Sequence, residues 1–320
     1  MADAELLLRG ARRPLVIGMG GGGDVVGALA TAEFARLYDG ADPIVGGLTW
    51  ERNAIDPVPG ARTVEEIEGA QQLAPGILLA DAQTRVRERE RDMFFAESRM
   101  AEFLGEPTVL IDVHGGPAAV ADGLIYASKR LGSDLLVFVD VGGDVLAQGD
   151  EPGLRSPLCD AITLAAAALV HRAGHPVLAG IFGIGCDAEL TPDEVLERLA
   201  DVAEAGGLLG ARGLTESVAQ RLEGAIELVP TEASAQAVRA FRGASGIAKI
   251  RGGAREVKLT TMAALTFYLE IEATIRSAGR LARAVIDAQS LEEANDALHR
   301  LGVRTELDLE RAQVPGRANV

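Results

Sequence analysis

Short apolar runs alternate with longer stretches of helical pattern through the first 190 residues of the chain. Val, Ile and Leu dominate these runs, none of which alternates cleanly with polar residues; they span 14–18, 43–48, 76–80, 108–113, 134–140 and 176–182. Strands without polar alternation are buried on both faces, which is typical of a parallel sheet. The stretches with a helical pattern lie between them, at 24–38, 84–104, 118–131 and 157–173. This alternation predicts an α/β fold with a doubly wound, mostly parallel sheet.

The pattern changes after residue 190. Thr191 is placed to cap a helix, Pro192 suits the first helical position, and Glu194 follows three residues after the cap. Helices are predicted at 191–204, 231–241 and 291–301, while 263–271 is either a strand or a buried helix. A chain of 320 residues has room for one large domain or two small ones. We expect a Rossmann-like α/β core over 1–190 and an α-rich C-terminal extension over 191–320, which packs on that core or continues the same domain.

The charge balance restricts the kinds of partner. The chain has 31 Lys and Arg against 47 Asp and Glu, a net charge of −16, so a broad basic face for nucleic acid is not expected. The longest largely apolar run, 162–170, is too short to cross a bilayer, and the acidic N-terminus is unlike a signal peptide. Cys159 and Cys186 do not make a disulfide framework. We therefore expect a cytoplasmic protein that binds a small anionic molecule, with no nucleic-acid or membrane partner, and a homo-oligomer is compatible with the sequence.

The densest glycine cluster directly follows the first predicted strand. Gly18, Gly20 and Gly23 match the pattern G-x-G-x-x-G, Gly21 and Gly22 lie between them, and a predicted helix follows. Without Cβ atoms, such a loop lets backbone N–H groups reach a ligand, and the helix dipole favours negative charge there. The loop therefore predicts a binding site for a phosphate group or a nucleotide. Tight packing of a turn, without a ligand, is the other interpretation.

Two observations disfavour a nicotinamide dinucleotide at this loop. The second predicted strand does not end on the acid that would hold the ribose hydroxyls, since Trp50 follows it and Glu51 comes late. Asp24 begins the helix that would face the phosphate, and its carboxylate repels phosphate unless a cation lies between them. Asp24 therefore either helps to hold a cation or caps the helix.

Carboxylates follow the ends of several predicted strands. Ligands of an open α/β sheet bind outside the carboxyl ends of its strands, so these acids are expected to share one edge: Asp24, Glu51, Asp112, Asp140, Asp144, Asp187 and Glu189. Clustered carboxylates stay ionised together only when a cation neutralises them, and Mg²⁺ or Mn²⁺ takes oxygen ligands and often bridges to phosphate. We expect a Mg²⁺ or Mn²⁺ site on Asp112, Asp140, Asp187 and Glu189. Asp140 and Asp144 are also candidate catalytic carboxylates, although any one acid could instead cap a helix or turn.

Other residues near these strand ends complete the predicted site. The expected substrate contacts are Trp50, Glu51, Arg52, Gly142 and Gly143. His114 lies beside an acid in a glycine-rich strand end and is a candidate general acid or base, a metal ligand, or a plain turn residue. The basic segment 249–258 either steers an anionic substrate or forms an exposed hairpin without a ligand.

These segments together resemble a known family. The similar stretches are GMGGGGDVVGALA (18–30), GGLTWER (46–52), DVHGG (112–116), VDVGGDVLAQG with SPLCDA (within 139–161) and FGIGCDAELTP (182–192). On them the chain is similar to the domain-of-unknown-function family 1152 of prokaryotic proteins. The resemblance implies a Rossmann-like α/β fold and names no reaction.

The sequence predicts an enzyme that acts on a phosphorylated or nucleotide-like small molecule, with divalent-metal-assisted hydrolysis or group transfer at the carboxyl ends of the strands. Two other classes stay open. One is a non-catalytic nucleotide-binding, small-molecule-binding or sensor protein that uses the same crevice. The other is an NAD(P)-dependent oxidoreductase.

Overall fold

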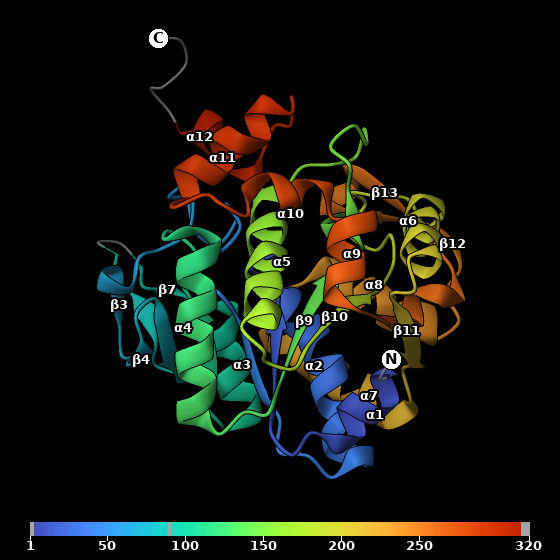
Figure 1. Ribbon diagram of the computed structural model, residues 1–320, viewed down its shortest axis with the longest axis horizontal. Helices are drawn as coiled ribbons and strands as arrows, with labels where there is room; N and C mark the ends of the chain where they lie inside the picture. The colour runs from blue at the N-terminus through green and yellow to red at the C-terminus, as the bar shows by residue number, and fades with distance from the viewer. Residues whose placement is uncertain (1–2, 89–90, 315–320) are drawn as a thin grey trace.

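The structure is a computed structural model that describes residues 3–88 and 91–314. A nine-stranded sheet in the order β11-β14-β10-β9-β1-β2-β8-β5-β4 crosses the molecule (Figure 1). Its strands are β1 (Pro14–Gly18), β2 (Ile44–Leu48), β4 (Gln71–Ala74), β5 (Ile77–Ala80), β8 (Thr108–Ile111), β9 (Leu135–Val141), β10 (Val177–Phe182), β11 (Leu208–Gly213) and β14 (Leu265–Leu269). Two small sheets pair β12 (Gly246–Ile250) with β13 (Arg255–Leu259), and β3 (Ile67–Glu68) with β6 (Arg85–Val86) and β7 (Met93–Phe94).

Helices cover both faces of the large sheet. In chain order they are α1 (Ala4–Gly10), α2 (Asp24–Phe34), α3 (Ala96–Leu104), α4 (Gly116–Leu131), α5 (Pro157–Arg172), α6 (Pro192–Glu204), α7 (Glu216–Leu228), α8 (Glu232–Phe241), α9 (Ile271–Ser277), α10 (Arg280–Val285), α11 (Leu291–Arg300) and α12 (Glu306–Gln313). Leu15 and Ile17 of β1 belong to the core that α4 and α5 cover. Val16, between them, belongs to the core that α2 and α3 cover. Because successive residues of one strand enter two cores, the strand must be apolar throughout, as the sequence is.

The centre of the sheet is parallel. Strands β10, β9, β1, β2 and β8 pair parallel with one another in that order. Every residue of β1, β9 and β10 is buried. The prediction of an α/β fold with a mostly parallel sheet flanked by helices is therefore confirmed.

The edges of the sheet differ from this parallel centre. Strand β5, predicted from the run 76–80, pairs antiparallel with β8 and forms a hairpin with β4. Gly76 makes that hairpin possible, since its φ of +69° lies in the left-handed region. At the other edge β14 is antiparallel to both β10 and β11. Of the ambiguous stretch 263–271, residues 265–269 are thus a strand, whose alternate faces meet the two cores of the sheet, while 263–264 end a 3-10 turn and Ile271 begins α9.

The helix predicted over 84–104 is wrong in its first half. Helix α3 begins only at Ala96, and short strands occupy 85–86 and 93–94, while residues 89–90 lie outside the described part of the chain. The alternating Arg and Glu residues of this stretch have the pattern of a solvent-exposed helix face, which is why the sequence predicts a helix there. Val86, Met93 and Phe95 instead bury in a separate small core with Leu78 and Leu110, which holds the backbone extended.

Residues 191–314 contribute both helices and strands. Helix α6 begins at the predicted capping box, in which Thr191 and Glu194 bond reciprocally, and the basic segment 249–258 lies in the hairpin β12–β13. Strands β11 and β14 join the main sheet. Helices α11 and α12 lie at the end of α5 where that helix begins (Figure 1), and Glu306 accepts hydrogen bonds from the Leu158 and Cys159 amides.

Among the described residues, every helix falls short of the length and apolar character that spanning a membrane requires.

Candidate functional site

The loop between β1 and α2 is shaped by its glycines. Gly21 and Gly22 have φ values of +76° and +53°, and a Cβ on Gly21 would lie 2.7 Å from the Trp50 carbonyl oxygen. The Gly22 amide donates to that same oxygen at 2.9 Å, and the Gly20 amide donates to Asp24 Oδ2 at 2.9 Å. Two of the four loop amides therefore bond within the protein. These two amides are not free to bind a phosphate group, and one of them helps to hold the Asp24 carboxylate in place.

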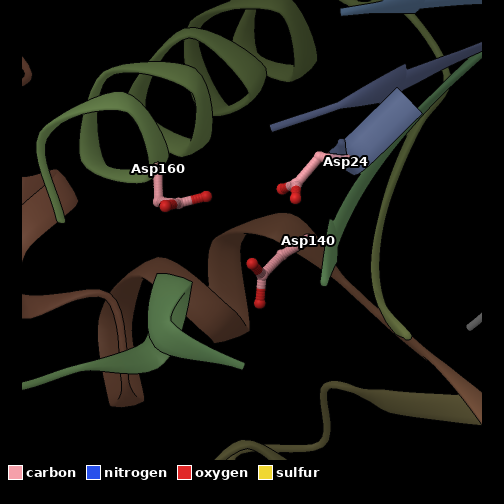
Figure 2. Close-up of side chains that lie close together, drawn as sticks. All are labelled: Asp24, Asp140 and Asp160. Atoms are coloured by element: carbon pink, nitrogen blue, oxygen red, sulfur yellow. The ribbon is translucent and has the colours of Figure 1, made fainter. Parts of the chain in front are cut away.

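Three carboxylates meet directly beside this loop. Asp24 comes from the start of α2, Asp140 from β9 and Asp160 from the first turn of α5, and one oxygen of each lies within 4.8 Å of the others. Figure 2 shows the three side chains pointing toward one another. We call this set the first acidic cluster. The strands β1 and β9 are neighbours, and α5 follows β9 along the chain, so the elements that carry these acids begin or end at one edge of the sheet.

The first acidic cluster is buried and only partly hydrogen-bonded. Asp140 and Asp160 are 1% and 2% exposed, and the Oδ1 atoms of both have no hydrogen-bond partner among the described residues. Asp140 Oδ2 accepts a 2.8 Å hydrogen bond from the Gly143 amide. A buried carboxylate oxygen without a partner is costly, so each such atom requires an explanation. A bound cation would satisfy both.

Burial makes this cluster hard to ionise. Burial raises the pKa of Asp24 to about 6 and that of Asp140 to about 8, and the charge of Asp24 adds to the shift at Asp140. The pKa of Asp160 is raised well above its ordinary value by burial and by the charges of Asp140 and Asp24. Ionisation of one of these carboxylates therefore disfavours ionisation of the other two, and a bound cation would offset this repulsion.

A second group of acids lies in the same cavity. Asp144 is in a 3-10 turn directly after β9, and Asp187 and Glu189 follow β10; one oxygen of each again lies within 4.8 Å of the others. We call this set the second acidic cluster. Gly142, with φ +126°, allows close approach, because a Cβ there would lie 2.3 Å from the Asp187 carboxyl carbon. Gly143, at φ +111°, holds the turn that carries Asp144.

Glu51 and Arg52, which follow β2, lie beside the same acids. Arg52 Nη2 donates to the Gly20 carbonyl at 2.9 Å. Burial alone would lower the pKa of Arg52, but nearby groups, including Glu306, Glu189 and Asp24, raise it, so the guanidinium stays charged. Glu51 is 5% exposed and accepts a 2.5 Å hydrogen bond from the Ala96 amide at the start of α3. Burial raises the pKa of Glu51 to about 7.

Five of the six acids of the two clusters, all but Asp140, line one cavity of about 600 Å³. On one side its lining is the loop Gly20–Gly23, Arg52 and the acids Asp24, Glu51, Asp144, Asp160, Asp187 and Glu189. Residues from far along the chain close the other side, including Thr231, Glu232 and Arg251. The volume lies within the range of small-molecule sites.

Asp112 and His114 lie elsewhere. Asp112 lines a second cavity of about 580 Å³ with Glu65, Ile77 and Tyr126, and the two cavities have no lining residue in common. Two strands, β1 and β2, separate β8 from β9, so the acids that follow them are about 14 Å apart at ordinary strand spacing. His114 Nδ1 lies 2.6 Å from Asp112 Oδ1, and this hydrogen bond raises the pKa of the imidazole. The structure therefore does not bring the predicted ligand Asp112 or the predicted acid–base His114 to the acidic clusters.

Two other residues of the predicted site, Trp50 and Gly18, have structural roles. The Trp50 side chain is fully buried, and its indole N–H donates to the Glu310 carboxylate instead of facing the cavity. Gly18 lies beneath the loop, where a Cβ would come within 2.6 Å of the Asp24 backbone. This glycine lets strand and helix approach closely.

Asp160 is the site residue that reasoning from the sequence missed. It lies in a helix of which 13 residues are buried, three positions after the first-turn proline Pro157. A carboxylate in a helix that is otherwise apolar on all sides was the available signal. The lining from Thr231, Glu232 and Arg251 has no comparable local signal, since it depends on how α8 and the hairpin β12–β13 pack over the sheet.

A Gly20→Ala variant is expected to weaken Mn²⁺ binding by ~10–100-fold, the range that support residues of a metal site commonly show. Its Cβ would lie 2.7 Å from Asp24 Oδ2 and 3.4 Å from both Asp160 carboxyl oxygens, so these carboxyl groups must move apart. Isothermal titration with Mn²⁺ measures the effect. Gly10→Ala is the matched control, because a Cβ there meets nothing within 4 Å. Equal affinities in the two variants would refute the view that Gly20 supports a metal site.

Fold and site together define an α/β protein with a cavity lined by buried acids at the carboxyl ends of its central parallel strands. A family model described as "Protein of unknown function (DUF1152)" matches residues 15–314, so the chain belongs to this family. No curated protein and no solved structure matches the chain.

Proposed function

We propose that the protein is an enzyme that binds Mg²⁺ or Mn²⁺ on Asp24, Asp140 and Asp160 and acts on a phosphorylated or nucleotide-like small molecule by hydrolysis or group transfer. The observation that carries this proposal is the first acidic cluster itself. Its three carboxylates come from three separate elements, are held together inside the protein, and keep two unpartnered oxygens beside a cavity. Hard divalent cations take such oxygen ligands.

The preference for a phosphate-bearing substrate follows from the charge of the cavity. Seven acids line it, Glu232 included, and an anion cannot enter such a site without cations. A divalent ion held by few protein ligands keeps open positions that substrate phosphates commonly fill. Arg251, which lines the opposite side, offers a further positive charge to the same substrate.

Glu51 is the group best placed to move a proton. It lines the cavity, and a Cβ on Gly22 would lie 3.8 Å from its Oε2 atom. A carboxyl whose pKa is raised by burial to about 7 exchanges a proton readily near neutral pH. Asp144 lines the same cavity and stays a candidate for the same role. In hydrolysis, Glu51 would take the proton that water loses as its oxygen bonds to phosphorus. The electron pair of the broken P–O bond would stay on the departing oxygen, which would take a proton from solvent water.

The order of the parallel strands supports a Rossmann-like description of the core. Taken along the chain, these strands stand in the order third, second, first, fourth, fifth, as in dinucleotide-binding domains. In such sheets ligands bind where the order reverses, between the first and fourth strands. These are β1 and β9, from whose ends Asp24 and Asp140 come. An NAD(P)-dependent oxidoreductase is the second candidate on this ground, although Asp24 lies close to where the dinucleotide phosphates would bind.

A thermal-shift experiment separates these candidates. We expect Mn²⁺ to raise the melting temperature, and a nucleoside diphosphate to raise it further only when Mn²⁺ is present, because a ligand of the folded state stabilises it. A rise with NAD(P) alone would instead favour the oxidoreductase. If metal and nucleotide bind but no substrate in a panel of phosphate esters and anhydrides is turned over, the non-catalytic sensor is favoured. No response to Mn²⁺ or Mg²⁺ at pH 8 would refute the proposal.

A further inference from the structure

We propose that the cavity binds a second divalent cation on Asp144, Asp187 and Glu189, so that the two acidic clusters form a two-metal centre for a phosphate-bearing substrate. This inference rests on the proposed function and assigns the second acidic cluster, which one cation on the first cluster leaves unexplained.

The second acidic cluster has the features of an empty cation site. Asp144, Asp187 and Glu189 are 5%, 7% and 3% exposed, and all three line the cavity. Neither carboxyl oxygen of Asp187 has a hydrogen-bond partner among the described residues, although the side chain is more than nine-tenths buried. A carboxylate that only capped a helix or a turn would accept hydrogen bonds from backbone amides. Such a structural role therefore does not explain two unpartnered oxygens on one buried carboxylate. They are accounted for if a cation binds there.

Glu189 is held firmly from the opposite side. Its Oε1 accepts from the Ser156 hydroxyl at 2.5 Å, and its Oε2 accepts from the Arg155 and Ser156 amides at 2.6 and 2.8 Å. Each carboxylate oxygen can accept more than one partner, so these bonds leave room for a metal. Bonds of this kind orient metal ligands. Glu189 is thus an already positioned oxygen ligand.

The two clusters adjoin through one short turn. Asp140 and Asp144 stand at either end of a turn in which Gly143 donates its amide to Asp140. Asp144 from the second cluster and Asp24 and Asp160 from the first line the same cavity. The short turn and the shared cavity place the two clusters next to each other, so we expect ions bound to them to contact one phosphate group.

Charge balance favours two ions over one. The six carboxylates of the two clusters carry a charge of −6 when ionised. Arg52, on which the charges of Glu189 and Asp24 act, and Arg255, whose Nη1 lies 3.8 Å from Glu189 Oε1, supply two positive charges. One divalent cation leaves this group of side chains with two excess negative charges, and two divalent cations neutralise it. Glu51, Glu232 and Arg251, which also line the cavity, add one net negative charge when ionised. Neutral surroundings admit an anionic substrate, and paired cations suit phosphoryl chemistry because they hold both the attacking and the leaving oxygen.

Metal stoichiometry and electron paramagnetic resonance with Mn²⁺ at pH 8 test this inference. The wild-type chain is expected to bind two Mn²⁺ ions, with a broadened spectrum from spin coupling between nearby ions. Asp187→Asn is expected to bind one ion with an uncoupled spectrum, and Asp144→Asn to do the same. Asp150→Asn is the control, because Asp150 is exposed and belongs to neither cluster. Circular dichroism verifies that each variant is folded.

The outcomes separate this inference from the proposed function. One ion in the wild type, unaffected by Asp187→Asn but lost in Asp160→Asn, overturns the second site and leaves the proposed function standing. One ion that Asp187→Asn removes and Asp160→Asn retains overturns the two-metal centre and also the placement of the metal in the proposed function. Two ions without spin coupling overturn the inference of a joint centre.

Discussion

An Asp160→Asn variant is expected to bind Mn²⁺ at the first acidic cluster at least ~100-fold more weakly than the wild type, because even outer contacts of a metal site are commonly worth ~10–100-fold in affinity. The substitution keeps the size of the side chain and removes one of three ligating charges. It also removes a buried carboxylate whose Oδ1 atom has no partner. The metal-free variant is therefore expected to be at least as stable as the wild type at pH 8. Titration calorimetry gives the affinity and urea unfolding gives the stability.

Asp150→Asn is the matched control, since it makes the same chemical change at an exposed position. Its affinity for Mn²⁺ is expected to equal that of the wild type. If Asp160→Asn keeps wild-type affinity, the first acidic cluster is not a metal site. If the variant loses both affinity and fold, Asp140→Asn repeats the test on another member of the cluster.

The metal-free protein is expected to lose stability as the pH rises from 5 to 9. The folded-state pKa values of Asp24 and Asp140, about 6 and about 8, lie above the value of ~3.9 for an unfolded Asp. A raised pKa means that the folded state holds protons that the unfolded chain releases, so this stability is complete below pH ~4 and is lost as the pH passes ~6 and then ~8. Each such proton changes the free energy of unfolding by up to ~1.4 kcal/mol per pH unit.

Acids whose pKa is lowered by hydrogen bonds or ion pairs do not hide this loss of stability between pH 5 and pH 9. Asp308, for example, is buried in part, but hydrogen bonds from Thr305 and His299 lower its pKa, so its contribution is lost only when the pH falls below the ordinary range of a carboxyl. Urea unfolding at several pH values with a chelator present measures the slope. Asp140→Asn is expected to flatten it, and Asp150→Asn is expected to leave it unchanged. A metal-free protein that is equally stable at pH 5 and pH 9 would contradict the prediction.

Bound metal is expected to reverse the dependence of stability on pH, so that the protein becomes more stable as the pH rises. The ions require ionised ligands, so metal affinity rises with pH and binding releases protons. Saturating Mg²⁺ should therefore raise the melting temperature much more at pH 8 than at pH 6. Calorimetry in buffers of different ionisation enthalpy counts the protons released.

Much of the architecture was readable from local patterns. Val, Ile and Leu runs without polar alternation predicted strands buried on both faces, since each residue of such a strand must enter one core or the other. The capping box at Thr191 and Glu194 marked the start of α6, because its partners are only three residues apart. The failure at 84–95 has the same origin. Charged alternation is a local pattern, and the separate core around Val86 and Phe95 that overrides it is not local.

The sequence by itself determined that a glycine bend follows the first strand and that acids follow several others. Only the tertiary structure decided which of those acids meet. The sheet order places β9 beside β1 but β8 two strands further away, so Asp140 joins Asp24 and Asp112 does not. The start of α5 brings Asp160 to the same point. Strand order and helix packing result from the burial of distant apolar faces against one another. The residues around a carboxylate can show that it will be buried, as at Asp160, but this non-directional force does not record there which other carboxylates it will meet.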